Sequence, residues 1–175
     1  MTRKTDPILD DLPALRRYAL TLSRDEGEAE DLVQEALLRG HEARGTLRAG
    51  GNIRGWLFGI LHNVFVDRYR SRTAEARRIV ATSLAAPQSA EAPQEAVVRL
   101  SQIRAAFLDL PQDQREALHL VAIEGLSYAE AADIAGVPIG TIMSRISRAC
   151  ARLREFEEGP ARPALQVVGG RNARG

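Results

Sequence analysis

The sequence predicts an all-α protein made of two small helical domains joined by a flexible linker. Apolar residues recur at spacings of three and four through most of the chain, which is the period of amphipathic helices, and no segment shows sustained alternation. Between the two helical parts, Ser83 to Glu95 is rich in alanine and proline and lacks aromatic residues. A length of 175 residues allows one or two domains.

We therefore divide the chain into four segments. The first domain is predicted at residues 9–80, with helices at about 9–22, 26–42 and 53–72. The linker covers residues 81–94. The second domain is predicted at residues 95–156, with helices at about 95–108, 113–123, 127–135 and 139–156. Residues 157–175, rich in glycine, proline and arginine, are predicted to form a flexible tail.

The helix at 26–42 has an acidic surface. Its buried stripe is predicted to contain Ala29, Leu32, Val33, Ala36 and Leu37. Asp31, Gln34 and Glu35 project together at i, i+3 and i+4, within a stretch from Asp25 to Glu35 that holds six carboxylates and no cation. A solvated acidic face is the commoner interpretation of such a cluster, and a binding surface for a basic partner is the other.

The helix at 53–72 has two dissimilar sides. One is a broad apolar face of Ile53, Leu57, Ile60, Leu61, Val64 and Phe65. Gly59, Asn63, Val66 and Arg70 line up on the other side, where we expect Gly59 to let another backbone pass close by. The polar loop before it, Arg44 to Asn52, either connects two helices or shapes a pocket for a base, and its composition favours the connector.

A helix-turn-helix is predicted from Leu126 to Arg154. Ser127 and Glu130 fit a capping box that begins the first helix. Gly136 supplies the positive φ that ends it, and Pro138 is tolerated only at the start of the next helix. Ile142, Ile146, Ala149 and Leu153 then form one apolar stripe.

The opposite side of this last helix is basic. It is predicted to present Thr141, Ser144, Arg145, Arg148 and Arg152, and four arginines with no acidic residue lie between Pro138 and Arg154. A solvated basic face would explain the arginines alone. Together with the capped helix and the glycine turn, they indicate a helix that enters a DNA groove.

Composition excludes several other classes of protein. The formal net charge is only +1, so affinity for nucleic acid must come from locally concentrated charge. Neither a membrane-spanning run nor a signal peptide is visible, which predicts a cytoplasmic protein without membrane insertion. His41, His62 and His119 lack metal-ligand spacing, and no nucleophile lies beside a base, so we expect no enzyme activity, cofactor, metal or small-molecule ligand.

The order of these motifs resembles a known family. It resembles the order found in bacterial RNA polymerase sigma factors of the extracytoplasmic-function type, within the sigma-70 family. The segments that carry the resemblance are DLVQEALLR, a glycine-containing loop, NIRGWLFGILHNVFVDRYR, a linker and LSYAEAADIAGVPIGTIMSRISRACARLR. The resemblance covers about residues 9–156. It is specific because two separate motifs occur in the right order, whereas a helix-turn-helix alone fits many regulators.

The resemblance implies a role for each half. The first would be sigma region 2, binding the clamp of the largest subunit of core RNA polymerase through Asp31, Gln34 and Glu35. It would also bind the −10 promoter element as a single strand, through Leu47, Asn52, Asn63 and Arg70. The second would be region 4, binding the −35 element in the major groove through Thr141, Ser144, Arg145, Arg148 and Arg152.

Two further expectations follow from the family. Members commonly serve stress or environmental responses and are held inactive by an anti-sigma factor, which we expect as a second protein partner. The alternative is a stand-alone helix-turn-helix repressor or activator, which should dimerise and bind a palindromic operator without polymerase.

Overall fold

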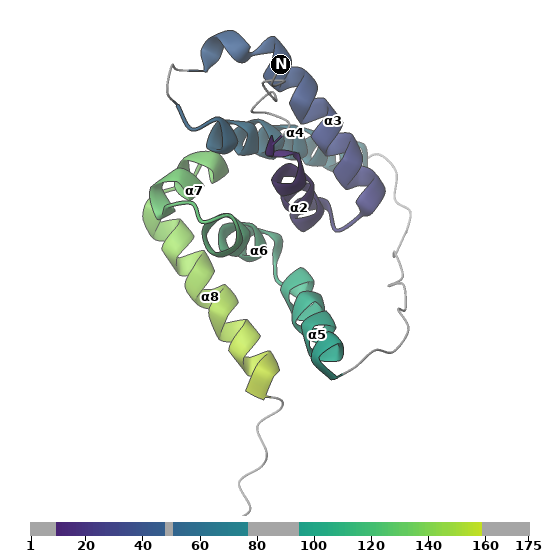
Figure 1. The fold of residues 1–175 in the computed structure, drawn as a ribbon, viewed down its shortest axis with the longest axis vertical. Coiled ribbons are helices and arrows are strands. Elements are labelled where there is room, and N and C mark those ends of the chain that lie inside the picture. Colours follow the sequence, from purple (N-terminus) through teal and green to yellow (C-terminus); the bar gives the residue numbers. More distant parts are fainter. Residues whose placement is uncertain (1–9, 48–50, 77–94, 159–175) are drawn as a thin grey trace, which may run out of the picture.

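The computed structural model describes residues 10–47, 51–76 and 95–158. These residues form helices and connecting turns without any β-strand, which confirms the all-α prediction. The first half contains α2 (Leu12–Ser23), α3 (Glu26–Glu42), the 3-10 turn η1 (Arg44–Thr46) and α4 (Ile53–Ala76). The second contains α5 (Glu95–Asp109), α6 (Gln112–Leu118), η2 (His119–Ile123), α7 (Tyr128–Ala135) and α8 (Ile139–Glu158), as Figure 1 shows.

Two of the predicted segments fall largely outside this description. The linker at 81–94 lies outside the described residues, as does the tail beyond Glu158. Among the helices that are described, none is both long and apolar enough to cross a membrane.

Local signals explain most of the helix ends. The Asp25 side chain accepts a hydrogen bond from the Glu28 N–H at 2.8 Å and begins α3, whose bounds match the prediction. The helix predicted at 113–123 is wrong after Leu118, because the backbone hydrogen bonds there span five residues instead of four. In η2, a π-helical turn, the Glu124 N–H donates to the His119 carbonyl at 3.0 Å, and Gly125 then leaves the helix with φ +70°.

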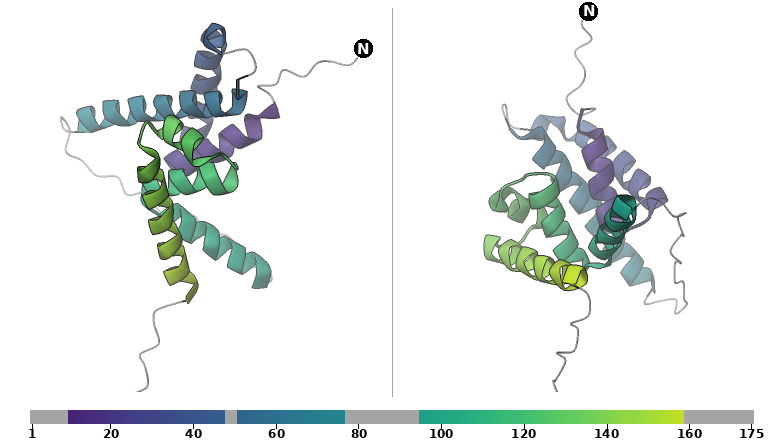
Figure 2. Two further views of the ribbon diagram at one scale, coloured as in Figure 1. Left: turned by 90° about the vertical axis from the view of Figure 1, so that its left-hand side faces the viewer. Right: turned by 60° about the horizontal axis from the view of Figure 1, so that its bottom comes forward.

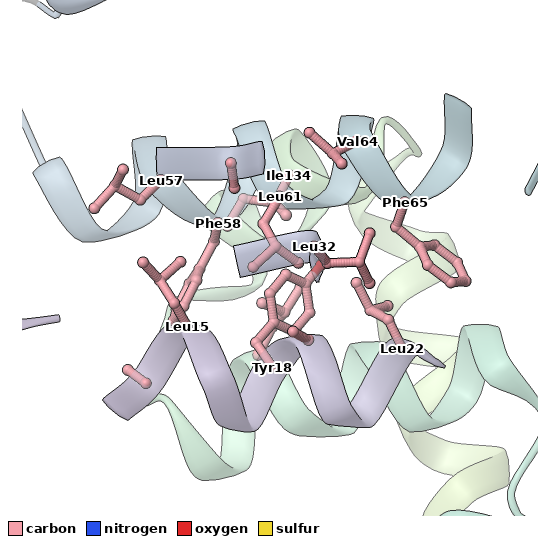
Figure 3. Close-up of a cluster of buried hydrophobic side chains, with 14 of the residues drawn as sticks. Leu15, Tyr18, Leu22, Leu32, Leu57, Phe58, Leu61, Val64, Phe65 and Ile134 are labelled. Atoms are coloured by element: carbon pink, nitrogen blue, oxygen red, sulfur yellow. The ribbon is translucent and has the colours of Figure 1, made fainter. Parts of the chain in front are cut away.

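The core of the first half is formed by α2, α3 and α4. Figure 3 shows Leu15, Tyr18 and Leu22 of α2 facing the apolar side of α4, with Leu32 of α3 among them. The Tyr18 and Phe58 rings pack with centroids 5.1 Å apart. Leu57, Leu61, Val64 and Phe65 are buried as predicted, whereas Ile53 and Ile60 are partly buried at the edge.

The close helix approach is at a different glycine from the one expected. A Cβ at Gly59 would meet no other atom within 4 Å, so the prediction for Gly59 was wrong. A Cβ at Gly40 would lie 3.3 Å from Leu57 Cδ2 and 3.7 Å from Trp56. Gly40 therefore lets α3 pack closely across the start of α4.

The two halves of the chain pack directly against each other. α7 lies against α4 and α6 lies against α2, an arrangement visible in the two views of Figure 2. Ile134 of α7 belongs to the same buried cluster as Phe58 and Leu61 of α4. The two predicted domains thus share one hydrophobic core, a contact that no sequence pattern indicated.

Candidate functional site

The helix-turn-helix forms as the sequence predicted. The Ser127 hydroxyl accepts from the Glu130 N–H at 3.2 Å, while the Glu130 carboxylate accepts from the Ser127 N–H at 2.9 Å. Hydrogen bonds donated to this carboxylate, first by the Ser127 N–H and then by the Ser127 hydroxyl and Asn52, lower the pKa of Glu130. Gly136 has φ 63°, and its N–H donates to the Ala132 carbonyl. The capping box and the glycine turn together fix where α8 leaves α7.

The cap should contribute measurably to stability. Replacing Ser127 by alanine removes the acceptor for the Glu130 N–H, so we expect the free energy of unfolding to fall by about 1 kcal/mol. Urea denaturation followed by circular dichroism measures it. Ser147→Ala, at an exposed position inside α8, is the matched control and should change the value by less than about 0.5 kcal/mol. Equal effects of the two changes would contradict a capping role.

The basic face of α8 is only partly as predicted. Ile142 and Ala149 are buried, and Arg148 and Arg152 are exposed on another side of the helix. Thr141 and Ser144 are partly buried, and the Ser144 hydroxyl donates to the Thr141 carbonyl at 2.9 Å.

Arg145 departs from that prediction. Its side chain is only 19% exposed, and its Nε lies 3.3 Å from an Asp113 carboxylate oxygen of α6. Arg145 therefore belongs to the α6–α8 packing edge in this structure and not to a free basic surface.

The acidic face of α3 also differs from the prediction. Asp31 and Gln34 are exposed, but the Glu35 carboxylate binds Arg39 and Arg68, each at 2.6 Å. Burial raises the pKa of Glu35, but the hydrogen bonds from Arg68 and Arg39 outweigh it and lower the pKa overall. The charge of Glu35 is thus neutralised within the chain, so the free negative charge of the cluster is smaller than expected.

Leu38 is a residue of this face that the sequence analysis missed. It lies three positions after Glu35 and seven after Asp31, which places it in the same stripe of α3. Its side chain is 66% exposed, so an unburied leucine stands next to Asp31 and Gln34. The signal that could have found it is the run Ala36, Leu37 and Leu38. One face of a helix cannot bury three consecutive apolar residues, so one of them must point outward.

The residues expected at the −10 element do not form one cluster. Asn63 and Arg70 are exposed on one side of α4, separated by two turns, or about 10 Å along the axis. Leu47 is partly buried at the end of η1. Asn52 is exposed, and its Oδ1 accepts from the Gly55 N–H at 3.0 Å. Its Nδ2 donates to the Glu130 carboxylate of α7 at 2.9 Å, so Asn52 already has a partner in the other half.

A buried polar cluster lies between the two halves, and the sequence analysis did not single it out. The Glu124 side chain is fully buried, accepts hydrogen bonds from Arg17 and Arg54, and has His119 Nε2 3.2 Å away. Glu116 accepts from the Tyr18 hydroxyl at 2.6 Å and lies 2.6 Å from His62 Nδ1. Burial, and then the charge of Glu116, raises the pKa of Tyr18.

His119 makes the stability of this cluster depend on pH. Burial first, and then the charge of Arg17, lowers its pKa from 6.5 to about 4. The groups that face it are Tyr18, Thr21, Arg17, Arg54, Glu116 and Glu124. Because the unfolded chain binds the proton more tightly, the free energy of unfolding should fall as the pH drops from about 6.5 to about 4.

The expected loss between pH 7 and pH 4.5 is about 2.5 kcal/mol from His119 alone, most of the full effect of the shift at about 1.4 kcal/mol per pKa unit. It is measured as the difference in unfolding free energy between pH 7 and pH 4.5, compared between the wild type and His119→Gln. All other titratable groups are present in both proteins, so the difference isolates His119. The exposed His41→Gln is the control and should retain the wild-type pH slope; an unchanged slope in His119→Gln would count against the assignment.

The comparisons with known proteins match both halves. The family model described as Sigma-70 region 2 matches residues 8–75, and the one described as Sigma-70, region 4 matches residues 100–153. The chain is 40% identical to the ECF RNA polymerase sigma factor EcfG of Rhodopseudomonas palustris (strain TIE-1), over 94% of each chain. It is 38% identical to the ECF RNA polymerase sigma factor SigC of Mycobacterium tuberculosis (strain CDC 1551), over 76% of this chain and 71% of the relative.

Solved structures match across both halves as well. The sigma factor RpoE of Bartonella quintana, in complex with the anti-sigma factor NepR, aligns with a TM-score of 0.71 and 38% identity over 86% of this chain and 94% of RpoE. CnrH, in complex with the cytosolic domain of CnrY, aligns with a TM-score of 0.60 and 24% identity over 86% and 84% of the two chains, a similarity of fold alone.

Proposed function

The chain belongs to the sigma-70 family of bacterial RNA polymerase sigma factors, in its extracytoplasmic-function branch, and on this premise we propose which surfaces carry the function. A sigma factor binds core RNA polymerase and directs it to promoters. Polymerase supplies the catalytic chemistry, so this chain needs no active site. The protein acts in the cytoplasm, where polymerase works on DNA.

Residues 9–80 bind polymerase and the −10 element, and residues 95–156 bind the −35 element. The observation that carries this proposal is the match of two separate region models in the same order as the two halves. Exposed Arg148 and Arg152 on α8 supply the positive charge that major-groove binding requires. Thr141, Ser144 and Arg145 flank them, although Arg145 must leave Asp113 before it can contact DNA.

The −10 surface in this proposal is the exposed side of α4. Asn63 and Arg70 are oriented to the same side and have the amide and guanidinium groups that bind unpaired bases and phosphates. Leu47 and Asn52 lie at the two ends of the preceding loop and complete the surface once Asn52 is released from Glu130.

The polymerase surface is the exposed stripe of α3. Asp31 and Gln34 supply polar groups, and the exposed Leu38 supplies apolar surface beside them that a partner can bury. Glu35 has a different part here: bound to Arg39 and Arg68, it holds α3 against α4. An anti-sigma factor is a second partner, because RpoE of Bartonella quintana, similar over both halves, was solved in complex with one. A stress or environmental response is the setting that such control suits.

Charge reversal on α3 tests the polymerase surface. We expect Asp31→Lys to lower the affinity for core polymerase about tenfold, because it places a cation against a basic partner surface. Glu26→Lys makes the same charge change on an exposed part of the same helix, away from this stripe, and should bind like the wild type. The measurement is a pull-down of core polymerase at graded concentrations.

A second assay tests the class of function. Run-off transcription of genomic DNA should yield defined start sites only when this chain and core polymerase are both present. Tight binding of the chain alone to a palindromic operator, without any gain in initiation, would instead show a stand-alone regulator.

A further inference from the structure

The two promoter-binding surfaces lie too close together in this structure to be used at once. Asn52, at the entry to α4, is bonded to Glu130 of α7 at 2.9 Å. On B-form DNA the −10 and −35 elements are centred about 25 base pairs apart, which is roughly 85 Å at 3.4 Å per base pair. α8, with 20 residues, spans only about 30 Å. The two halves must therefore separate before both elements are bound.

Besides the shared hydrophobic core, an ion-pair cluster centred on one carboxylate joins the two halves. Glu124 lies in the second half, and the arginines that bind it, Arg17 of α2 and Arg54 of α4, both lie in the first. The Glu124 side chain is fully buried, so this ion pair exists only while the halves are packed together. Removal of one member of such a pair leaves an uncompensated charge in the interface.

Two further polar contacts cross the same boundary. Glu116 of α6 accepts from Tyr18 of α2 and lies beside His62 of α4. Arg115 donates to the Thr21 carbonyl at 2.5 Å and to the Leu22 carbonyl at 3.4 Å. These groups become hydrated when the halves separate, so this polar part of the interface exchanges protein hydrogen bonds for hydrogen bonds to water.

We propose that Glu124, with Arg17 and Arg54, forms a latch that holds this sigma factor in a closed state unable to initiate transcription, and that promoter recognition requires the latch to open. The inference rests on the proposed assignment of the −10 and −35 surfaces to the two halves. None of the three latch residues belongs to those surfaces or to the polymerase stripe of α3. Changes in the latch therefore alter the closed state without removing a proposed contact with DNA or polymerase.

A reversible crosslink tests whether the closed state is inactive. Arg24 at the end of α2 and Asp109 at the end of α5 are both exposed. The Arg24 guanidinium lies 3.4 Å from an Asp109 carboxylate oxygen across the boundary between the halves. In a Cys150→Ser background, Arg24→Cys and Asp109→Cys are joined by a short bismaleimide whose spacer contains a disulfide. We expect the joined protein, mixed with core polymerase, to lose at least tenfold in promoter-specific initiation and to recover it when dithiothreitol cleaves the spacer. Equal initiation before and after cleavage overturns the proposal.

Release of the latch is the complementary experiment. Glu124→Gln should open the free protein, which increases its radius of gyration in small-angle X-ray scattering, and should raise initiation at least threefold when the sigma factor is limiting. Arg17→Gln removes the more exposed of the two arginines that bind Glu124. It replaces Glu124→Gln if that variant loses helix content, and it should change both readouts in the same direction. Glu30→Gln, which breaks the exposed Arg16–Glu30 pair within the first half, should leave both readouts unchanged.

The outcomes separate this inference from the proposed function. A radius of gyration unchanged in both latch variants, with unchanged initiation, overturns the latch while leaving the sigma-factor assignment in place. An uncrosslinked wild type that gives no start sites with core polymerase contradicts the proposed function, and the scattering of the free protein still tests closure by itself.

Discussion

Replacement of Arg115 by methionine is expected to lower the free energy of unfolding by about 3 to 5 kcal/mol. The guanidinium donates to four carbonyls, at 2.5 Å to Thr21, 3.4 Å to Leu22, 3.0 Å to Leu108 and 2.7 Å to Leu110. Methionine fills much of the space but removes these four hydrogen bonds, each of which contributes about 1 kcal/mol net. Burial lowers the pKa of Arg115 to about 10, so the side chain is still charged at neutral pH.

Urea denaturation followed by circular dichroism gives the value. Arg115→Lys should recover less than half of the loss, because a single ammonium group cannot reach carbonyls that the planar guanidinium contacts in several directions. Arg104→Met, at an exposed position of α5, is the matched control and should stay within about 0.5 kcal/mol of the wild type. If Arg115→Lys were as stable as the wild type, charge alone and not the shape of the donor would explain the site.

The helix-turn-helix could be predicted from the sequence because its signals are local. The Ser127 cap, the Glu130 partner and the Gly136 turn each act over three or four residues, and the structure contains all three. The apolar period placed Ile142 and Ala149 in the core for the same reason. The π-helical turn at His119 was missed, because an apolar run such as HLVAI fits an α-helix equally well.

The predicted surfaces were less accurate because a helical projection gives the direction of a side chain and not its neighbours. Arg145 points to the side of α8 that Asp113 of α6 approaches, and Glu35 points to the side of α3 that Arg68 of α4 approaches. Both partners are far from these residues in sequence or on another helix. Pairing of this kind follows from tertiary packing, which no periodicity encodes.

The interface between the halves could not be predicted for a related reason. Glu116 and Glu124 lie at positions where a carboxylate is normally solvated, and their partners Tyr18, Arg17 and Arg54 are more than fifty residues away. A carboxylate becomes acceptable in the interior only once arginines converge on it. The arginines that converge on Glu124 come from the first half, so the same contact packs the two halves of the sigma factor into one unit.

Loss of two exposed arginines of α8, Arg148 and Arg152, should have the largest effect on promoter use. We expect Arg148→Ala together with Arg152→Ala to lower initiation by the holoenzyme at least about 30-fold, since two contacts of at least about 1 kcal/mol each are removed. The measurement is run-off transcription from a promoter chosen among the start sites mapped with the wild type. Arg16→Ala together with Arg104→Ala removes two other exposed arginines and should leave initiation within about twofold.

A second template assigns the loss to the −35 element. When the upstream element of the same promoter is replaced by unrelated sequence, the wild type should fall towards the level of the double variant, because the contacts that Arg148 and Arg152 make are already gone. If the double variant initiates as far below the wild type on this template as on the intact promoter, the two arginines do not contact the −35 element. Since both side chains are exposed in the closed structure, α8 is positioned to meet DNA first, and separation of the halves then brings α4 to the −10 element.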